Sequence, residues 1–140
     1  MTAKRTFLDV TPEKGAAFFG TSDEGPVAML NLLRFRQTAD YSHAPALAPL
    51  APVSGREAYD RYMREMLPLL HASGGEVLFL GTSAQFLIGP QDEQWDHVLL
   101  VRQASKASFL AFASDPESQS ITAHRTAAIS DSRLLPIRED

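Results

Sequence analysis

The segment Pro26–Arg36, PVAMLNLLRFR, constrains the fold more than any other part of the sequence. It predicts a β-strand over residues 27–36 in which apolar side chains occupy both alternating sets of positions. A strand in an antiparallel sheet that is covered on one face alternates apolar and polar residues, and this strand does not. Only Asn31 and Arg34 interrupt it. We therefore expect both faces of the sheet to be buried.

Capping residues and apolar periodicity predict the remaining elements. Ser54 and Glu57 have the spacing of a capping box at the start of the longest helix, in which Glu57–Arg61 and Asp60–Arg64 are expected i,i+4 ion pairs. In chain order we expect a helix over 12–19, a strand over 27–36, a helix over 55–73, strands over 76–88 and 95–103, a short helix after residue 105, a helix over 116–128 and a strand over 131–137.

This order predicts the ferredoxin-like βαββαβ arrangement with an extra N-terminal helix, an α+β fold in one domain over residues 1–140. The four strands would form an antiparallel sheet with two helices on one face. The segment 37–54 is rich in Pro and Ala and has no regular period. Irregular segments of this length in a compact domain are often functional, so we expect a flap here.

The second face of the sheet needs its own cover. The strand 95–103 places Leu99 and Val101 on one face and Val98 and Leu100 on the other, so it too is apolar on both. The N-terminal helix is too short to mask four strands. A second copy of the chain, packed sheet against sheet, would bury roughly 1,600 Å² in total. We therefore expect a homodimer.

Several segments carry a resemblance to a known family: MLNLLRF, GREAYDRYM, LPLLHASGGEVLFLG, WDHVLLVRQASKASFLAFASDPE and HRTAAISDSRLLP. Over residues 26–137 the chain resembles a small bacterial family of unknown function in the dimeric α+β barrel superfamily. The resemblance implies a homodimer in which two sheets close into a barrel, with a cavity in each subunit between the sheet and the helices or loops. Other branches include cofactor-independent monooxygenases, muconolactone-type isomerases, haem enzymes and regulatory ligand-binding modules.

Composition excludes several classes of function. The chain has 17 acidic and 13 basic residues, a net charge of −4, which argues against nucleic acid or an anionic membrane as partner. It has no cysteine, so disulfides, thiolate nucleophiles and cysteine-ligated metals are excluded. No apolar run approaches the roughly 18 residues of a membrane span, and the N-terminus lacks the apolar core of a signal peptide. We expect a cytoplasmic protein.

Polar residues on apolar elements are the candidate site residues. Asn31 is either a satisfied core amide or a pocket residue that binds a ligand carbonyl or hydroxyl. Arg34 and Asp96 lie on neighbouring strands, where they form either a structural ion pair or a carboxylate-binding site. His124 is the preferred general base, with Arg125 beside it as a binding residue. The four histidines have no metal-ligand spacing, so no metal site is expected.

Two functions remain open from the sequence. The first is a small-molecule-binding dimeric barrel protein that acts as a monooxygenase- or isomerase-like enzyme without a cofactor, with haem on His124 as a less favoured variant. The alternative is a non-catalytic homodimer that binds a ligand or a protein partner. The positions of the other three histidines need no functional explanation. His43 lies in the loop, His71 lies at a helix C-terminus, and His97 lies in the core.

Overall fold

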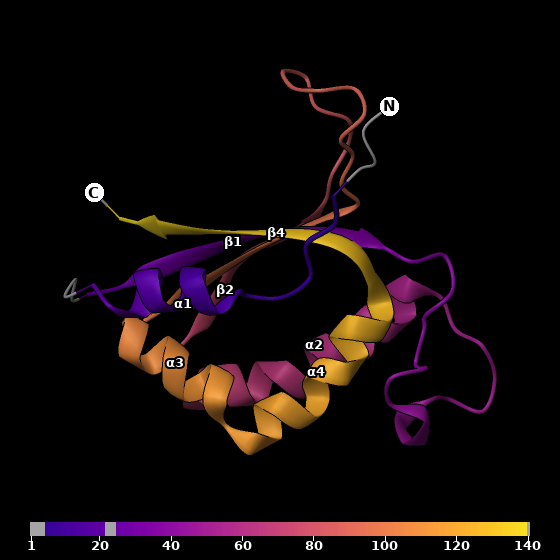
Figure 1. Cartoon of the computed structure of the whole chain (residues 1–140), viewed down its shortest axis with the longest axis horizontal. Coiled ribbons are helices and arrows are strands. Elements are labelled where there is room, and N and C mark those ends of the chain that lie inside the picture. Colours follow the sequence, from indigo (N-terminus) through magenta and orange to yellow (C-terminus); the bar gives the residue numbers. More distant parts are fainter. Residues whose placement is uncertain (1–4, 22–24, 140) are drawn as a thin grey trace.

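The computed structural model describes residues 5–21 and 25–139 (Figure 1). Within these residues no helix is long and apolar enough to cross a membrane. The elements, in chain order, are α1 (Pro12–Phe19), β1 (Val27–Phe35), the 3₁₀ turn η1 (Pro45–Leu47), α2 (Gly55–Ala72), β2 (Glu76–Thr82), β3 (His97–Gln103), α3 (Lys106–Ser114), α4 (Pro116–Ala128) and β4 (Ile129–Arg138).

The four strands form one antiparallel sheet in the order β2-β3-β1-β4, and the helices lie on one side of it (Figure 1). This is the predicted ferredoxin-like order, with α1 as the extra N-terminal helix. The two central strands, β1 and β3, are those that the sequence predicts to be apolar on both faces. Asn31 of β1 lies between Leu99 of β3 and Leu134 of β4, which fixes the register of the sheet centre.

The helices begin where the capping residues predict. The Ser54 hydroxyl accepts a hydrogen bond from the Glu57 backbone N–H at 3.0 Å, and the Glu57 carboxylate accepts one from the Ser54 N–H at 3.4 Å, which completes the capping box. The next residue, Gly55, sits against two backbone carbonyls. A Cβ there would collide with the carbonyl oxygens of Arg36 and Ala128, so only glycine lets α2 begin this close to the end of α4.

The core lies between the sheet and helices α2 and α4. Its residues come from the helix-facing positions of β1 and β3, from the inner stripe of α2 and from the start of β4: Leu33, Tyr59, Met63, Met66, Leu70, Leu99, Val101 and Ile129. The Tyr–Met stripe of α2 that the sequence places on one apolar face is therefore part of this core. Its packing against β1 and α4 fixes the wall from which the candidate site is built.

The second strand is shorter than predicted. The sequence predicts it over residues 76–88, but β2 ends at Thr82, and a bulge at Leu78 shifts its register against β3. Two backbone hydrogen bonds follow, from the Ser83 N–H to the Asp96 carbonyl at 3.0 Å and from the Asp96 N–H to the Leu33 carbonyl at 2.8 Å, and between residues 83 and 96 the chain leaves the sheet. Residues 83–96, called the arm below, project from the sheet on the side opposite the helices (Figure 1). Apolar alternation alone does not separate such an arm from a continuing strand.

The face of the sheet away from the helices, called the outer face below, is apolar and open. Helix α1 packs against α3 through the rings of Phe18, Phe19 and Phe109, so it does not cover this face. Register places on the outer face Leu30, Leu32, Phe79, Val98, Leu100, Leu135 and Ile137. Phe79 and Leu135 are more than half exposed. In this one chain the predicted burial of the second face is absent.

Candidate functional site

His124, the candidate general base, lies between two polar side chains, Tyr41 and Glu65. It is buried in the inner face of α4, with 2% of its surface exposed. The Tyr41 hydroxyl oxygen lies 2.8 Å from its Nδ1, and a Glu65 carboxylate oxygen lies 3.2 Å from its Nε2. Tyr41 comes from the loop after β1 and Glu65 from α2. The fold thus brings together a phenol, an imidazole and a carboxylate from three separate segments.

The direction of the hydrogen bond between Tyr41 and His124 follows from the charge of His124. Burial, reinforced by the nearby Arg61 cation, lowers the pKa of His124, while Glu65 raises it by a smaller amount. The imidazole is therefore neutral at pH 7 and carries one N–H. Because Nε2 lies beside the carboxylate oxygen of Glu65, we assign the N–H to Nε2, so that Nδ1 accepts from the Tyr41 hydroxyl.

The phenol at the other end is also neutral at rest. Burial raises the pKa of Tyr41, and the Glu65 carboxylate raises it further, whereas Arg61 lowers it. Arg61 thus favours the phenolate form of Tyr41 and disfavours the cationic form of His124. A single cation is therefore placed to influence both groups between which a proton would pass.

Backbone hydrogen bonds hold the loop that carries Tyr41 against α4. The Arg36 N–H donates to the Ala128 carbonyl at 2.8 Å, and the Asp40 N–H donates to the Ala127 carbonyl at 2.9 Å. The segment 37–54, which the sequence predicts as a flap, is therefore tied to the helix that carries His124. In this position Tyr41 is 8% exposed, and its ring meets that of His124 edge-on at 5.5 Å.

A cavity of about 300 Å³ opens between this loop and α2, with Tyr41 in its wall. Its other lining residues are Pro49, Val53, Glu57, Ala58, Asp60, Arg61 and Arg64. The size is at the lower end of the range for small-molecule sites. Apolar groups from the loop and charged groups from the first turns of α2 face each other across it. The arrangement can hold a small ligand against Tyr41.

The charges along α2 differ from the prediction. The carboxylate of Glu57 is used in the capping box, and that of Asp60 pairs with Arg56 at 3.4 Å. The expected pairs with Arg61 and Arg64 are therefore wrong, because each acid has an alternative partner nearer the helix start. Among the described residues, no carboxylate lies within 4.0 Å of the Arg61 guanidinium. A half-buried cation without a counterion thus lines the cavity beside Tyr41.

The expected meeting of Arg34 and Asp96 is also corrected. Arg34 donates two hydrogen bonds to the Gln94 carbonyl, at 3.0 and 2.7 Å, and lies 3.8 Å from Asp131. Asp96 instead accepts a hydrogen bond from the Phe35 backbone N–H at 2.8 Å. The two residues are neighbours in register, as predicted, but each finds backbone groups closer to hand. Neither lies in the cavity beside Tyr41.

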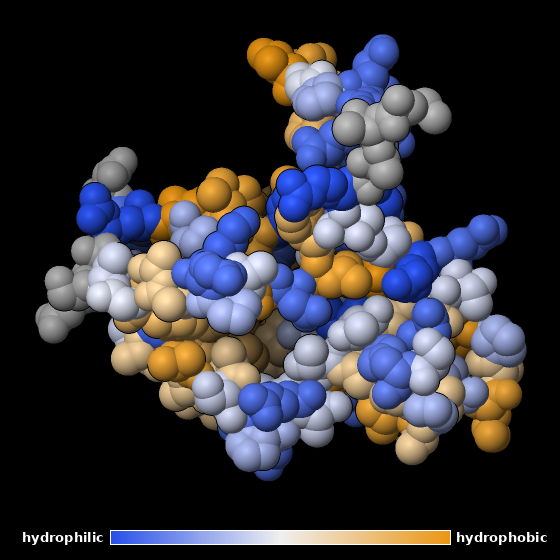
Figure 2. Space-filling view, viewed as in Figure 1, coloured by the Kyte–Doolittle hydropathy of each residue, from blue (hydrophilic) through white to orange (hydrophobic). Residues whose placement is uncertain are grey.

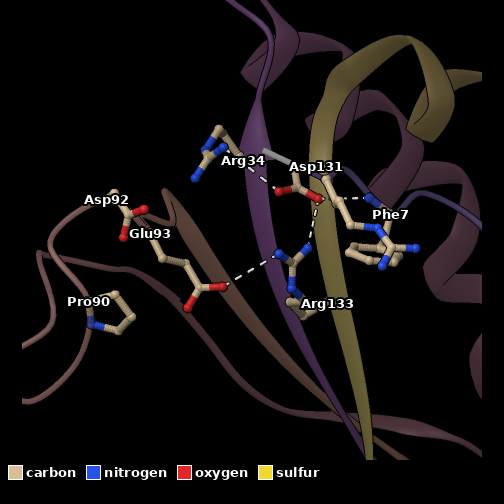
Figure 3. A pocket seen from close by; sticks show the side chains of 8 residues that line it. Phe7, Arg34, Pro90, Asp92, Glu93, Asp131 and Arg133 are labelled. Atoms are coloured by element: carbon tan, nitrogen blue, oxygen red, sulfur yellow. Dashed lines mark hydrogen bonds and ion pairs between the residues drawn. The ribbon is translucent and has the colours of Figure 1, made fainter. Parts of the chain in front are cut away.

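Arg34 belongs to a second cavity, of about 260 Å³, at the base of the arm (Figure 3). Its centre is Asp131, which is 4% exposed and accepts hydrogen bonds from the Phe7 N–H at 2.9 Å and from Arg133 at 2.8 Å. Arg133 also lies 3.5 Å from Glu93 of the arm. The sequence places Asp131 only at the start of the last predicted strand. These groups satisfy one another, and together they join the arm to β1 and β4.

The two remaining predicted residues lie outside the His124 cluster. The Asn31 amide donates to the carbonyls of Met29 and Leu99, both at 3.2 Å, which is the structural one of its two predicted roles. The Arg125 guanidinium donates to the Leu8 carbonyl at 3.0 Å, which ties the N-terminal segment to α4. No three His, Asp or Glu side chains within residues 5–21 and 25–139 are grouped so that they could hold a metal ion.

Sequence reasoning missed Tyr41, Glu65 and Arg61. Tyr41 lies in an aperiodic loop, and Glu65 and Arg61 occupy ordinary surface positions of an amphipathic helix. A single signal was available: with Glu57 assigned to the capping box, Arg61 is left without its i,i+4 partner.

Comparisons with known proteins support the fold. A sequence model described as a domain of unknown function (DUF1330) matches residues 35–137. Two crystal structures of a protein of unknown function from Rhodopseudomonas palustris, one of them methylated, are 38% identical to this chain. The TM-scores are 0.86 and 0.84, respectively. Each match covers 96% of this chain, and the matches cover 95% and 98% of the two solved chains.

A more distant structure shares the fold alone. It is a dabb family protein with a ferredoxin-like fold from Mesorhizobium loti, with a TM-score of 0.53 and 10% identity over 83% of this chain and 98% of its own. No curated protein matches the sequence. The matched proteins therefore support the fold and assign no activity.

Proposed function

We propose a function from the geometry alone, because the chain belongs to the DUF1330 family, which is described as a domain of unknown function. The protein binds a small carboxylate-bearing molecule in the cavity between segment 37–54 and α2, and it moves a proton of that molecule through Tyr41. The observation that carries the proposal is the hydrogen bond between Tyr41, in the wall of this cavity, and buried His124, whose Nε2 lies 3.2 Å from the half-exposed Glu65 carboxylate.

The transfer is a general acid–base step in two halves. In the first, the Tyr41 oxygen takes a proton from an acidic C–H of the ligand while its own hydroxyl proton passes to His124 Nδ1. The resulting imidazolium is stabilised by Glu65 at Nε2. In the second half the protons return, and Tyr41 delivers one to a different atom of the ligand. The product is an isomer, and no electrons are gained or lost.

Arg61 supports the proposed ligand class. Its guanidinium lines the cavity, and no counterion lies within 4.0 Å among the described residues. A ligand carboxylate is the group that a guanidinium binds best, through two parallel hydrogen bonds. The bound anion would also offset part of the effect of Arg61 on Tyr41 and His124. Binding and proton transfer are therefore linked through one side chain.

The same geometry favours a reaction without a cofactor. Nδ1 of His124 is hydrogen-bonded to Tyr41 at 2.8 Å and Nε2 lies 3.2 Å from the Glu65 carboxylate, so a haem iron would have to displace either Tyr41 or Glu65. Isomerisation by proton transfer uses the three residues as they stand. The alternative of a non-catalytic binding module keeps the cavity and Arg61 but gives the hydrogen bond between Tyr41 and His124 a structural role only.

We also propose that the protein acts as a homodimer through the outer face. The exposed fractions of Phe79, Leu135 and Ile137 are 58%, 56% and 38%, and half-buried Leu30, Leu32, Val98 and Leu100 extend the same surface. An apolar surface that spans four strands exceeds the scattered apolar residues of an ordinary monomer surface. A second copy with the same surface would bury it symmetrically.

Deuterium exchange tests the proposed reaction. The protein is incubated in deuterium oxide with small 2-oxo and unsaturated carboxylates, and the loss of ligand C–H signals is followed by proton NMR. The wild-type protein should catalyse deuterium exchange into at least one ligand. The exchange rate of Tyr41→Phe should be lower by about 100-fold, within the range for loss of a general acid–base group. Arg61→Met should bind that ligand more weakly. Arg56→Met, which changes a paired arginine on the same helix, is the matched control. Ligands that bind at Arg61 without any exchange would favour the non-catalytic alternative.

A further inference from the structure

The arm carries large apolar side chains that are almost fully exposed to solvent. Leu87 is 99% exposed and Ile88 is 94% exposed, and Phe86 beside them is 42% exposed. Figure 2 shows hydrophobic side chains at the far end of the arm, well away from the body of the protein. Two fully hydrated branched side chains next to each other are unfavourable unless something covers them.

The base of the arm is firmly held. The Ser83 hydroxyl donates to the Trp95 carbonyl at 2.5 Å, and Arg34 donates to the Gln94 carbonyl from the neighbouring strand. Glu93 lies 3.5 Å from Arg133 of β4 in the cluster shown in Figure 3. These contacts fix the direction in which the arm leaves the sheet. Its tip is therefore presented at a set position and does not fold back onto its own chain.

The direction of the arm indicates which molecule covers its tip. The arm rises on the side of the sheet opposite the helices, which is the side of the outer face (Figure 1). A second copy seated on the outer face would therefore lie directly beside the arm. The apolar tip and the apolar outer face are separate surfaces, with the charged cluster of Figure 3 at the base of the arm, and one second copy would cover both. A lipid surface is disfavoured, because the chain has a net charge of −4 and the acidic side chains of Asp92 and Glu93 lie on the arm itself.

We propose that the arm is a clasp that grips the second copy in the dimer, with Leu87 and Ile88 buried against it. This inference rests on the proposed homodimer but goes beyond it, because a sheet-to-sheet dimer does not require the arm. In a two-fold dimer each subunit would grip the other. The clasp would add two apolar contacts at a distance from the sheet interface, so it would slow dissociation more than it would speed association.

Photo-cross-linking tests the contact directly. A benzophenone amino acid is placed at residue 87 in one variant and at residue 50 in another. Leu50 lies in segment 37–54 and is also fully exposed. Irradiation should give a covalent dimer from residue 87 and little or none from residue 50. Equal yields from both positions, or none from residue 87 in a protein that sediments as a dimer, would overturn the clasp.

Sedimentation measurements separate the clasp from the dimer itself. The double variant L87D/I88D should keep the wild-type fold, because both side chains are solvent-exposed in the single chain, and should raise the dimer dissociation constant about tenfold or more. L50D should leave it unchanged, and Phe79→Asp should give monomers. An unchanged dissociation constant for L87D/I88D beside a monomeric Phe79→Asp would refute the clasp alone. A monomeric wild type would refute both the dimer and the clasp.

Discussion

Removal of the Tyr41 hydroxyl is the sharpest perturbation of the candidate site. Tyr41→Phe keeps the ring, which is 8% exposed and packs against His124, and removes only the donor to Nδ1. The net worth of one neutral hydrogen bond is about 1 kcal/mol, and a buried acceptor left without a partner costs about 1–3 kcal/mol. Among residues 5–21 and 25–139, no second hydrogen-bond donor is found at this nitrogen. We expect the free energy of unfolding to fall by about 1–3 kcal/mol, and Tm by roughly 3–8 °C.

Urea unfolding followed by circular dichroism measures this loss, with Tyr62→Phe as the control. Tyr62 lies on α2, is half-buried, and its hydroxyl makes no hydrogen bond among the described residues. The control should therefore change the free energy of unfolding by less than about 0.5 kcal/mol. If Tyr41→Phe were as stable as wild type, the 2.8 Å contact would contribute nothing, and the proton path from Tyr41 to His124 would lose its support.

Three further predictions follow from the same contacts. Burial lowers the pKa of His124 and that of His97, so the folded state holds fewer protons than the unfolded chain. The stability should therefore be full above about pH 6.5 and fall as the pH drops below it. A thermal-melt series on His124→Gln should show a shallower fall. Glu65→Gln removes the carboxylate that raises the pKa of His124, so an NMR titration should give a still lower value. Gly55→Ala should destabilise the protein by several kcal/mol in urea, because the added Cβ would collide with backbone carbonyl oxygens. An unchanged urea midpoint would contradict the close approach of α2 to α4.

The sequence predicts the fold well, because its signals are local. Thr11, Ser54, Ser105 and Asp115 each cap a helix that begins where the sequence predicts one. The central strands were recognisable from apolar residues on both of their faces. The arm was missed because the residues around Leu87 are as apolar as a buried strand. Periodicity reports which residues avoid water and not what covers them.

The candidate site was predictable only in part, because it is assembled from distant segments. His124 stands out as a polar residue near the inner stripe of α4, but Tyr41 is 83 residues away and lies in an aperiodic loop. Its position depends on backbone hydrogen bonds between that loop and α4, which no side-chain pattern encodes. The expected pairing of Arg34 with Asp96 failed for a related reason: backbone carbonyl and N–H groups competed for both side chains.

The nitrogen-15 NMR spectrum of His124 tests the central claim most directly. A neutral imidazole that accepts from Tyr41 at Nδ1 must carry its proton on Nε2, the nitrogen beside Glu65. At pH 7 the spectrum should show a protonated Nε2 and an unprotonated Nδ1, and Tyr41→Phe should shift the Nδ1 signal most. A proton on Nδ1, or a fully protonated ring at pH 7, would reverse the first hydrogen bond and contradict the proton path from Tyr41 to His124.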